Sequence, residues 1–126
     1  SAETVQKKMH YVHQDGKNVF KFAVRGMAEI SDEILKKHGY TAEDLKLYIP
    51  HQANLRIIRA AVDKMNLRDS QVPINIDRYA NTTAGTIPIC LSEASESKQI
   101  TRGDLVLMAS FGAGFTWGSL LFRWEI

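Results

Sequence analysis

The feature that most constrains the fold is an unbroken apolar run near the end of the chain, from Leu105 to Ser110. A strand with one face in solvent alternates apolar and polar residues, so a continuous apolar run is typical of a strand covered on both faces. Such a strand needs further layers on both sides of its sheet, which favours an α/β domain. A chain of 126 residues suits one such domain with one core.

Two longer segments carry the three- and four-residue spacing of apolar side chains that is typical of amphipathic helices. The first spans residues 19–37, with Asn18 as its predicted N-cap and Gly39 directly after its last turn. The second spans residues 52–66. We expect both helices to pack an apolar face against the sheet.

Two short strands and a third helix complete the predicted layers. Apolar residues alternate over 45–49 and predict one strand, and residues 72–77 predict another. The third helix is expected over about 84–98, with Asn81 or Thr82 as its cap.

Both ends of the chain are predicted to be extended. Residues 1–18 are expected to form a lead-in strand, near 9–13, followed by a turn, and residues 19–126 form the core of the single domain. A glycine-rich loop then leads into a closing strand over 115–124. A glycine inside that strand, Gly118, suggests close approach of another backbone.

Composition excludes several classes of function. The formal charge of +2 is too small for the concentrated basic face of a nucleic-acid-binding domain. No apolar run reaches the ~20 residues of a membrane span, and no targeting segment is visible, which favours a cytoplasmic protein. Cys90 is the only cysteine, so no internal disulfide or thiolate zinc site is expected. His10 and His13 would lie on opposite faces of the expected strand, so we expect no metal there.

The predicted strand over 45–49 ends in Pro50, and His51 follows at once beside the start of a helix. Strand ends of this kind present catalytic side chains in α/β proteins. The positive end of the helix dipole disfavours the imidazolium form, so we expect a neutral His51 that can donate a hydrogen bond to a developing oxyanion. The alternative is a histidine with a structural role only.

A second polar turn, at Asn81, precedes the third helix. An asparagine there is either an N-cap or an amide donor that stabilises an enolate or a tetrahedral oxyanion. Because His51 and Asn81 both precede helices, their donors can point the same way. The loop over 112–114 lacks the third glycine and the helix of a dinucleotide-binding motif. It is either a hairpin turn or the source of a backbone N–H for a thioester carbonyl.

Two other features have ordinary structural explanations. Cys90 lies on the apolar part of the third helix and is expected to be a buried thiol rather than a nucleophile. Lys17, Lys21 and Arg25 recur every four residues and form a basic stripe along one helix edge. Such a stripe is either solvated surface or a docking site for an acidic partner.

Three motifs together resemble one known family. They are PHQANLRII over 50–58, DRYANTTA over 77–84 and FGAGFTWG over 111–118. In this order and spacing they resemble β-ketoacyl-[acyl-carrier-protein] synthase III, and the likeness covers about 16–124. The resemblance implies the C-terminal half of a thiolase-like α/β fold, with a mixed, mainly parallel sheet between helices and a C-terminal antiparallel hairpin.

The resemblance also implies an active site of the Cys-His-Asn type. His51 and Asn81 match its histidine and asparagine, whereas the cysteine belongs to the N-terminal half and is not Cys90. Phe111 matches a phenylalanine beside the site, and the N–H of Ala113 matches a donor of the oxyanion hole. The family often has glycine at the position of Ala113.

Two further sets of residues match functional positions of the family. Three match the lining of the pantetheine tunnel: Gly16, Ala53 and Asn54. Lys21 and Arg56 match positions where the family docks the acidic carrier protein, and Arg25 of the basic stripe is expected to dock it as well. The expected partners are acyl carrier protein, acyl-CoA, the N-terminal half and a second copy in a homodimer, with no nucleic acid or membrane. The substrates carry their own CoA or phosphopantetheine, so no metal and no resident cofactor are implied.

The resemblance implies an enzyme that condenses an acyl-CoA primer, expected to be acetyl-CoA, with malonyl-carrier protein to start type II fatty-acid synthesis. The chain begins Ser-Ala-Glu without methionine, so we expect a piece of a longer protein that is inactive alone. One alternative is a condensing enzyme of a secondary pathway with the same fold. Another is a non-catalytic module that binds carrier protein.

Overall fold

The centre of the molecule is a three-stranded sheet in the order β1-β2-β3. The computed structural model describes all residues from 1 to 126. Strand β1 (Leu47–Pro50) pairs in parallel with β2 (Leu105–Gly112), and β2 pairs antiparallel with β3 (Thr116–Arg123). The sheet is therefore mixed and ends in the predicted C-terminal hairpin, with one parallel and one antiparallel pairing.

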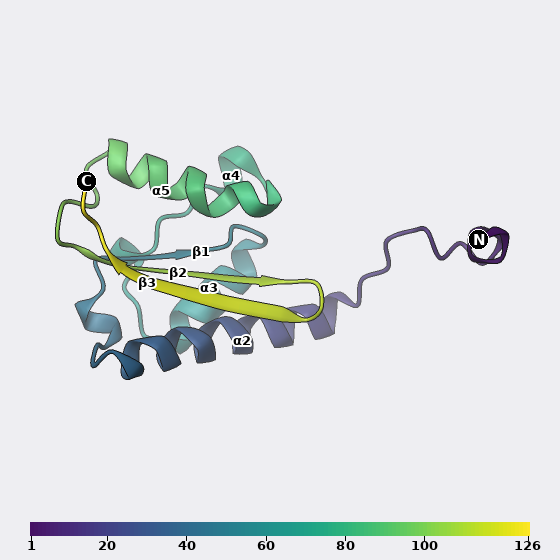
Figure 1. The fold of residues 1–126 in the computed structure, drawn as a ribbon, viewed down its shortest axis with the longest axis horizontal. Helices are drawn as coiled ribbons and strands as arrows, with labels where there is room; N and C mark the ends of the chain where they lie inside the picture. The colour runs from purple at the N-terminus through teal and green to yellow at the C-terminus, as the bar shows by residue number, and fades with distance from the viewer.

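Helices cover both faces of this sheet, as the apolar run in β2 predicts (Figure 1). One layer holds α2 (Gly16–Lys37) and α3 (Leu55–Lys64), and the other holds α4 (Ile76–Tyr79) and α5 (Thr86–Glu96). Short 3-10 turns connect them: η1 (Ala42–Asp44), η2 (Asp69–Gln71) and η3 (Thr83–Gly85). None of these helices combines the length and apolar character that crossing a bilayer would need.

Successive residues of β1 and β2 point into two separate cores, because side chains alternate along a strand. Tyr48 and Leu107 belong to the core under α2 and α3, which also contains Met27 and Ile58. The neighbouring strand residues contribute to the core under α5, which contains Leu47, Ile49, Val106, Cys90, Ala94 and Ile100. Both strands are thus covered on both faces.

The start of the chain differs from the prediction. Residues 9–13 form no strand, and α1 (Ala2–Gln6) lies at the end of an extended arm in Figure 1. The hydroxyl of Ser1 accepts from the backbone N–H of Thr4 at 3.3 Å, and this cap favours a helix. No neighbouring strand offers its backbone to 9–13. The argument about His10 and His13 on opposite strand faces therefore does not apply.

Helix α2 begins three residues earlier than predicted. Its N-cap is Asp15, whose Oδ1 accepts from the backbone N–H of Asn18 at 3.1 Å. Asn18 lies inside the first turn and donates its side-chain amide to Asp15 Oδ2 at 2.7 Å. The predicted cap is wrong because either residue type can cap a helix. Gly39 follows the helix end with φ +73, as predicted.

The segment 72–77, predicted as a strand, also forms no strand. Two of its backbone groups are paired instead by Gln52, a fully buried side chain. The amide of Gln52 donates to Pro73 O at 3.4 Å and accepts from the backbone N–H of Asn75 at 3.2 Å. A side-chain amide thus takes the place of a neighbouring strand, and α4 begins at Ile76.

Close approach occurs at a different glycine from the one predicted. A Cβ added to Gly118 would meet nothing within 4 Å, so that expectation is wrong. A Cβ added to Gly26 in α2 would lie 3.0 Å from the ring of Trp117. Next to this contact, Ser119 Oγ donates to Ile30 O at 3.1 Å. The hairpin therefore packs closely against α2 through the Trp117 ring and the Ser119 hydroxyl.

Replacing the cap of α2 tests its assignment. Asp15→Ala removes the acceptor for the N–H of Asn18 and should lower the free energy of unfolding by about 1 kcal/mol. Asn18→Ala is the matched control and should change it by less than about 0.5 kcal/mol, because alanine favours a helix interior. Urea denaturation followed by circular dichroism gives both values. A larger loss for Asn18→Ala would reassign the cap to Asn18.

Candidate active site

One large cavity, of about 1100 Å³, lies where β1 ends, α2 and α3 begin and the hairpin turns. Segments far apart in the sequence line it. Of the ten predicted site residues, eight are among its lining residues: Gly16, His51, Ala53, Asn54, Arg56, Asn81, Phe111 and Ala113. The structure does not bring Lys21 or Arg25 to this cavity.

The backbone at His51 continues the ladder of β1. Its N–H donates to Ala109 O at 2.8 Å, one residue beyond the last pair of the parallel register. The imidazole is half-buried, and this burial lowers its pKa. A lowered pKa favours the neutral imidazole, the form that the sequence analysis expects, and its physical cause is burial. Its Nδ1 lies 2.5 Å from Oγ1 of Thr86.

Asn81 is held at the turn before the third helix, and its amide nitrogen stays free. Its Oδ1 accepts from the backbone N–H of Thr83, the first residue of the turn η3, at 2.9 Å. Its Nδ2 forms no hydrogen bond within the chain, although the residue is exposed and lines the cavity. An amide held by its oxygen presents its nitrogen as a free donor.

The hairpin contributes an aromatic ring, from the end of β2, and a backbone turn. The Phe111 ring packs against Phe115 with centroids 5.1 Å apart and stacks on Trp117 at 6.3 Å. The positive φ in this loop, +144, falls on Gly114 and not on Ala113. An alanine is therefore tolerated at the position where the family often has glycine.

The residues matched to the pantetheine tunnel lie at two helix starts. Gly16 is the first residue of α2, and a Cβ there would meet nothing within 4 Å. Asn54 caps α3, with its Oδ1 accepting from the backbone N–H of Arg56 at 2.9 Å. Helix α3 therefore begins at Leu55, three residues later than predicted.

The basic residues divide into two groups. Arg56 lies at the cavity with its guanidinium 5.6 Å from the centroid of Phe20, and Lys17 lines the same cavity. Lys21 is exposed further along α2, and Arg25 forms an exposed ion pair with Glu29 at 2.8 Å. Arg25 is thus partly neutralised, which makes it the weakest of the three predicted docking residues.

A polar cluster that the sequence did not suggest holds the segment before Asn81. Glu93 on α5 accepts from both terminal guanidinium nitrogens of Arg78, from Asn75 Nδ2 at 2.8 Å and from the Tyr79 hydroxyl at 2.9 Å. These bonds, led by that from Arg78, lower the pKa of Glu93 to about 2. Contacts across 14 to 18 residues leave no local signal in the sequence.

Cys90 is a structural thiol, as predicted. It is 1% exposed in the core under α5 and does not line the cavity. Burial raises its pKa to about 11, so the unreactive thiol form dominates at neutral pH.

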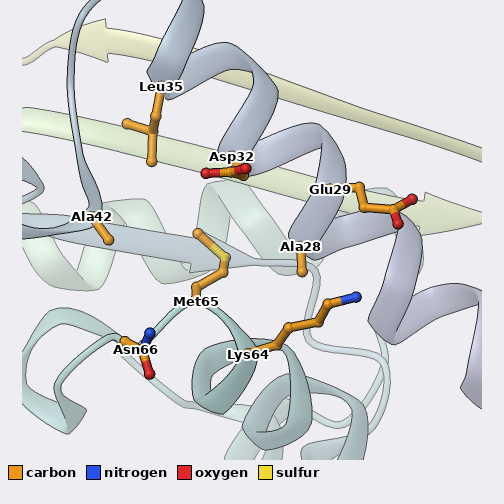
Figure 2. A pocket seen from close by; sticks show the side chains of 8 residues that line it. All are labelled: Ala28, Glu29, Asp32, Leu35, Ala42, Lys64, Met65 and Asn66. Atoms are coloured by element: carbon orange, nitrogen blue, oxygen red, sulfur yellow. The ribbon is translucent and has the colours of Figure 1, made fainter.

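A smaller cavity, of about 260 Å³, lies between α2 and α3 (Figure 2). Its lining includes two carboxylates, Glu29 and Asp32, and both are bound to basic neighbours on α2. Met65 and Leu35 supply apolar surface. It contains none of the predicted site residues and offers no comparable set of donors.

Solved structures with the same fold are known. One is β-ketoacyl-[acyl carrier protein] synthase III from Thermus thermophilus, with TM-score 0.87 and 47% identity over 90% of this chain and 35% of that one. Another is 3-oxoacyl-[acyl-carrier-protein] synthase III from Aquifex aeolicus, with TM-score 0.88 and 46% identity over 90% and 37%. The fold and the cavity therefore define half of a thiolase-like protein.

The family follows from the sequence match. Residues 35–124 match the model for the C terminal of 3-oxoacyl-[acyl-carrier-protein (ACP)] synthase III, and the chain belongs to this family. One relative is the β-ketoacyl-[acyl-carrier-protein] synthase III of Chlorobium phaeobacteroides, which is 50% identical over 123 residues. The match covers 98% of this chain and 37% of that relative, so the chain spans little more than a third of the relative's length.

The pH dependence of stability tests the Glu93 cluster. The pKa of Glu93 falls from 4.5 to about 2 on folding, so the stability it contributes is complete above pH 4.5 and is lost as the pH falls toward 2. Glu93→Gln should therefore flatten the decline in unfolding free energy between about pH 5 and about pH 3. Urea titrations at each pH measure this. Glu33→Gln, at an exposed residue of α2, is the control, and equal slopes for wild type and Glu93→Gln would contradict the assignment.

Proposed function

We propose that this chain is the C-terminal half of a decarboxylating 3-ketoacyl-[acyl-carrier-protein] synthase, an acyltransferase. The enzyme condenses an acyl-CoA primer, acetyl-CoA, with malonyl-carrier protein and so starts type II fatty-acid synthesis. The observation that carries the proposal is the cavity lined together by His51, Asn81 and Ala113. Family membership supports the same conclusion.

In the proposed reaction, a cysteine of the N-terminal half first takes the acyl group from acyl-CoA. The malonyl thioester then binds in the cavity, with its carbonyl oxygen facing Nε2–H of His51 and Nδ2–H of Asn81. Loss of carbon dioxide leaves an enolate, and both donors stabilise the negative charge on its oxygen. They bind this oxygen more strongly as its charge grows, which lowers the barrier to decarboxylation.

The enolate carbon then attacks the acyl carbonyl on the cysteine. The charge now moves to the acyl oxygen, where the N–H of Ala113 and the cysteine's own N–H act as the oxyanion hole. Collapse of the tetrahedral intermediate releases the thiolate and 3-ketoacyl-carrier protein. These steps use N–H donors and a thiolate, so they require neither a metal nor a resident cofactor.

The remaining cavity residues guide the substrate. Phe111 gives the carboxylate of malonate an apolar neighbour, which discourages its hydration and favours its loss. The pantetheine arm passes Gly16, Ala53 and Asn54 at the two helix starts. The acidic carrier protein docks on Lys21, Arg25 and Arg56, and the intact enzyme is a cytoplasmic homodimer.

Replacing His51 tests whether its imidazole acts in malonyl decarboxylation and not in acylation of the cysteine. In the full-length protein, His51→Ala should lower malonyl decarboxylation by about 10²- to 10³-fold, because one oxyanion donor is lost. Acylation of the cysteine by radiolabelled acetyl-CoA should remain within a few-fold of wild type. His38→Ala, at an exposed histidine outside the cavity, is the control.

Equal loss of acylation and decarboxylation in His51→Ala would contradict this proposal. The 126-residue chain alone provides the background, because without the cysteine half it should form no ketoacyl product. A full-length protein that accepts only branched or longer acyl-CoA primers would identify a related synthase of a secondary pathway. A protein that binds carrier protein without any turnover would identify a non-catalytic module.

Charge reversal tests the docking surface. Lys21→Glu and Arg56→Glu in the full-length protein should each raise KM for malonyl-carrier protein by roughly tenfold, because a charge that attracts the acidic partner now repels it. Lys37→Glu at the far end of α2 is the matched control and should leave KM unchanged. Steady-state kinetics with varied carrier protein measures the effect. An unchanged KM in both variants would make these residues ordinary surface.

A further inference from the structure

A short chain of polar contacts joins the two proposed donors. Nδ1 of His51 lies 2.5 Å from Oγ1 of Thr86, and that oxygen lies 3.1 Å from Thr83 O. The backbone N–H of Thr83 donates in turn to Oδ1 of Asn81 at 2.9 Å. Thr86 is only 2% exposed, so no solvent competes freely for its hydroxyl. The turn over 83–86 thus contacts both proposed catalytic side chains.

The single proton of the Thr86 hydroxyl has two acceptors within reach, and their situations differ. Thr83 O already accepts from the backbone N–H of Thr86 as the turn η3 closes. It therefore does not depend on the hydroxyl for a partner. Nδ1 of His51 lies closer, and the hydroxyl is the only group of the chain bonded to it. The unshared and nearer acceptor is the ring nitrogen.

We infer that Thr86 is a positioning residue that donates its hydroxyl proton to Nδ1 of His51 and thereby fixes the neutral ring with its proton on Nε2. This inference rests on the proposed function. An imidazole that accepts at Nδ1 must carry its hydrogen on Nε2, which is the nitrogen without a partner in the chain. Only this tautomer can donate to a thioester carbonyl or an enolate oxygen.

The same turn also orients the side-chain amide of Asn81, the second proposed donor. Asn81 Oδ1 is held by the N–H of Thr83, which leaves Nδ2 to face the cavity. Thr83 adopts φ +51, a conformation that β-branched residues rarely adopt. In this conformation its N–H reaches Asn81 while its carbonyl faces Thr86. This one residue thus holds the amide of Asn81, and its carbonyl lies beside the hydroxyl that contacts His51.

The opposite proton arrangement has a different consequence. If Nδ1 carried the proton and donated to Thr86, the hydroxyl would donate onward to Thr83 O. Nε2 would then present a lone pair and repel the oxygen of an enolate. The two arrangements place the same atoms at the same distances, so the position of the proton distinguishes them.

Nitrogen NMR of the 126-residue chain with labelled histidine side chains tests the inference directly. Two-bond proton–nitrogen spectra at a pH where His51 is neutral distinguish a protonated ring nitrogen from a bare one. We expect wild type and Thr86→Ser to show His51 with its proton on Nε2 and a hydrogen-bonded Nδ1. Thr86→Val, which keeps the shape and loses the hydroxyl, should shift Nδ1 to the position of an unbonded acceptor. Exposed His38 provides the reference signal.

Two outcomes overturn the inference. One is a wild-type His51 with its proton on Nδ1, and the other is a Thr86→Val spectrum identical to wild type. The wild-type spectrum alone decides the direction of the bond, so the test remains valid if Thr86→Val fails to fold.

Kinetics of the full-length protein provide the second readout. Thr86→Val should lower kcat for malonyl decarboxylation by about 10- to 100-fold, as when a partner that orients a metal-binding histidine is removed. KM for malonyl-carrier protein should stay unchanged, and Thr86→Ser should restore the rate. Wild-type kcat in Thr86→Val, with His51→Ala inactive, would overturn this inference alone. Full decarboxylation in His51→Ala would overturn the proposed function, whereas the NMR result would still stand.

Discussion

The parallel pairing of β1 with β2 is the constraint on which the rest of the structure depends. Its register runs from Leu47 opposite Val106 to Pro50 opposite Ala109, and the N–H of His51 extends it by one bond. Because both strands are buried on both faces, a slip of one residue would exchange the two cores. The register therefore fixes where the chain leaves the sheet, and with it the position of the imidazole.

The fold could be predicted where a local pattern determines the structure. The apolar run of β2, the helical spacing of α2 and the alternation before Pro50 each depend on near neighbours, and all three elements are present. Residues 9–13 and 72–77 fail for one shared reason. Whether an extended segment becomes a strand depends on a partner backbone, and here 9–13 has none while Gln52 occupies the place of a partner for 72–77.

The residues of the candidate site could also be predicted only where a local pattern marks them. His51, Asn81 and the loop at Ala113 stand out in the sequence because each lies where a predicted strand or helix begins or ends, and all three line the cavity. Thr86 does not stand out, since a threonine in the first turn of a helix is commonplace. Its contact with His51 spans 35 residues, so only the packing of α5 against β1 brings them together. The roles assigned to these residues remain proposals, whereas the buried state of Cys90 is confirmed.

Because Gln52 is fully buried, no solvent could replace the hydrogen bonds that a chemical change of its amide would remove. Its amide nitrogen faces two carbonyl oxygens, of Pro50 and Pro73, and its oxygen receives the N–H of Asn75. A carboxyl group in place of this amide would have one O–H donor for the two carbonyls when protonated and none when ionised. This replacement would separate the end of β1 from the segment leading to α4. Such a change adds almost no volume, yet it would shift His51 and Asn81, the two proposed donors, relative to one another.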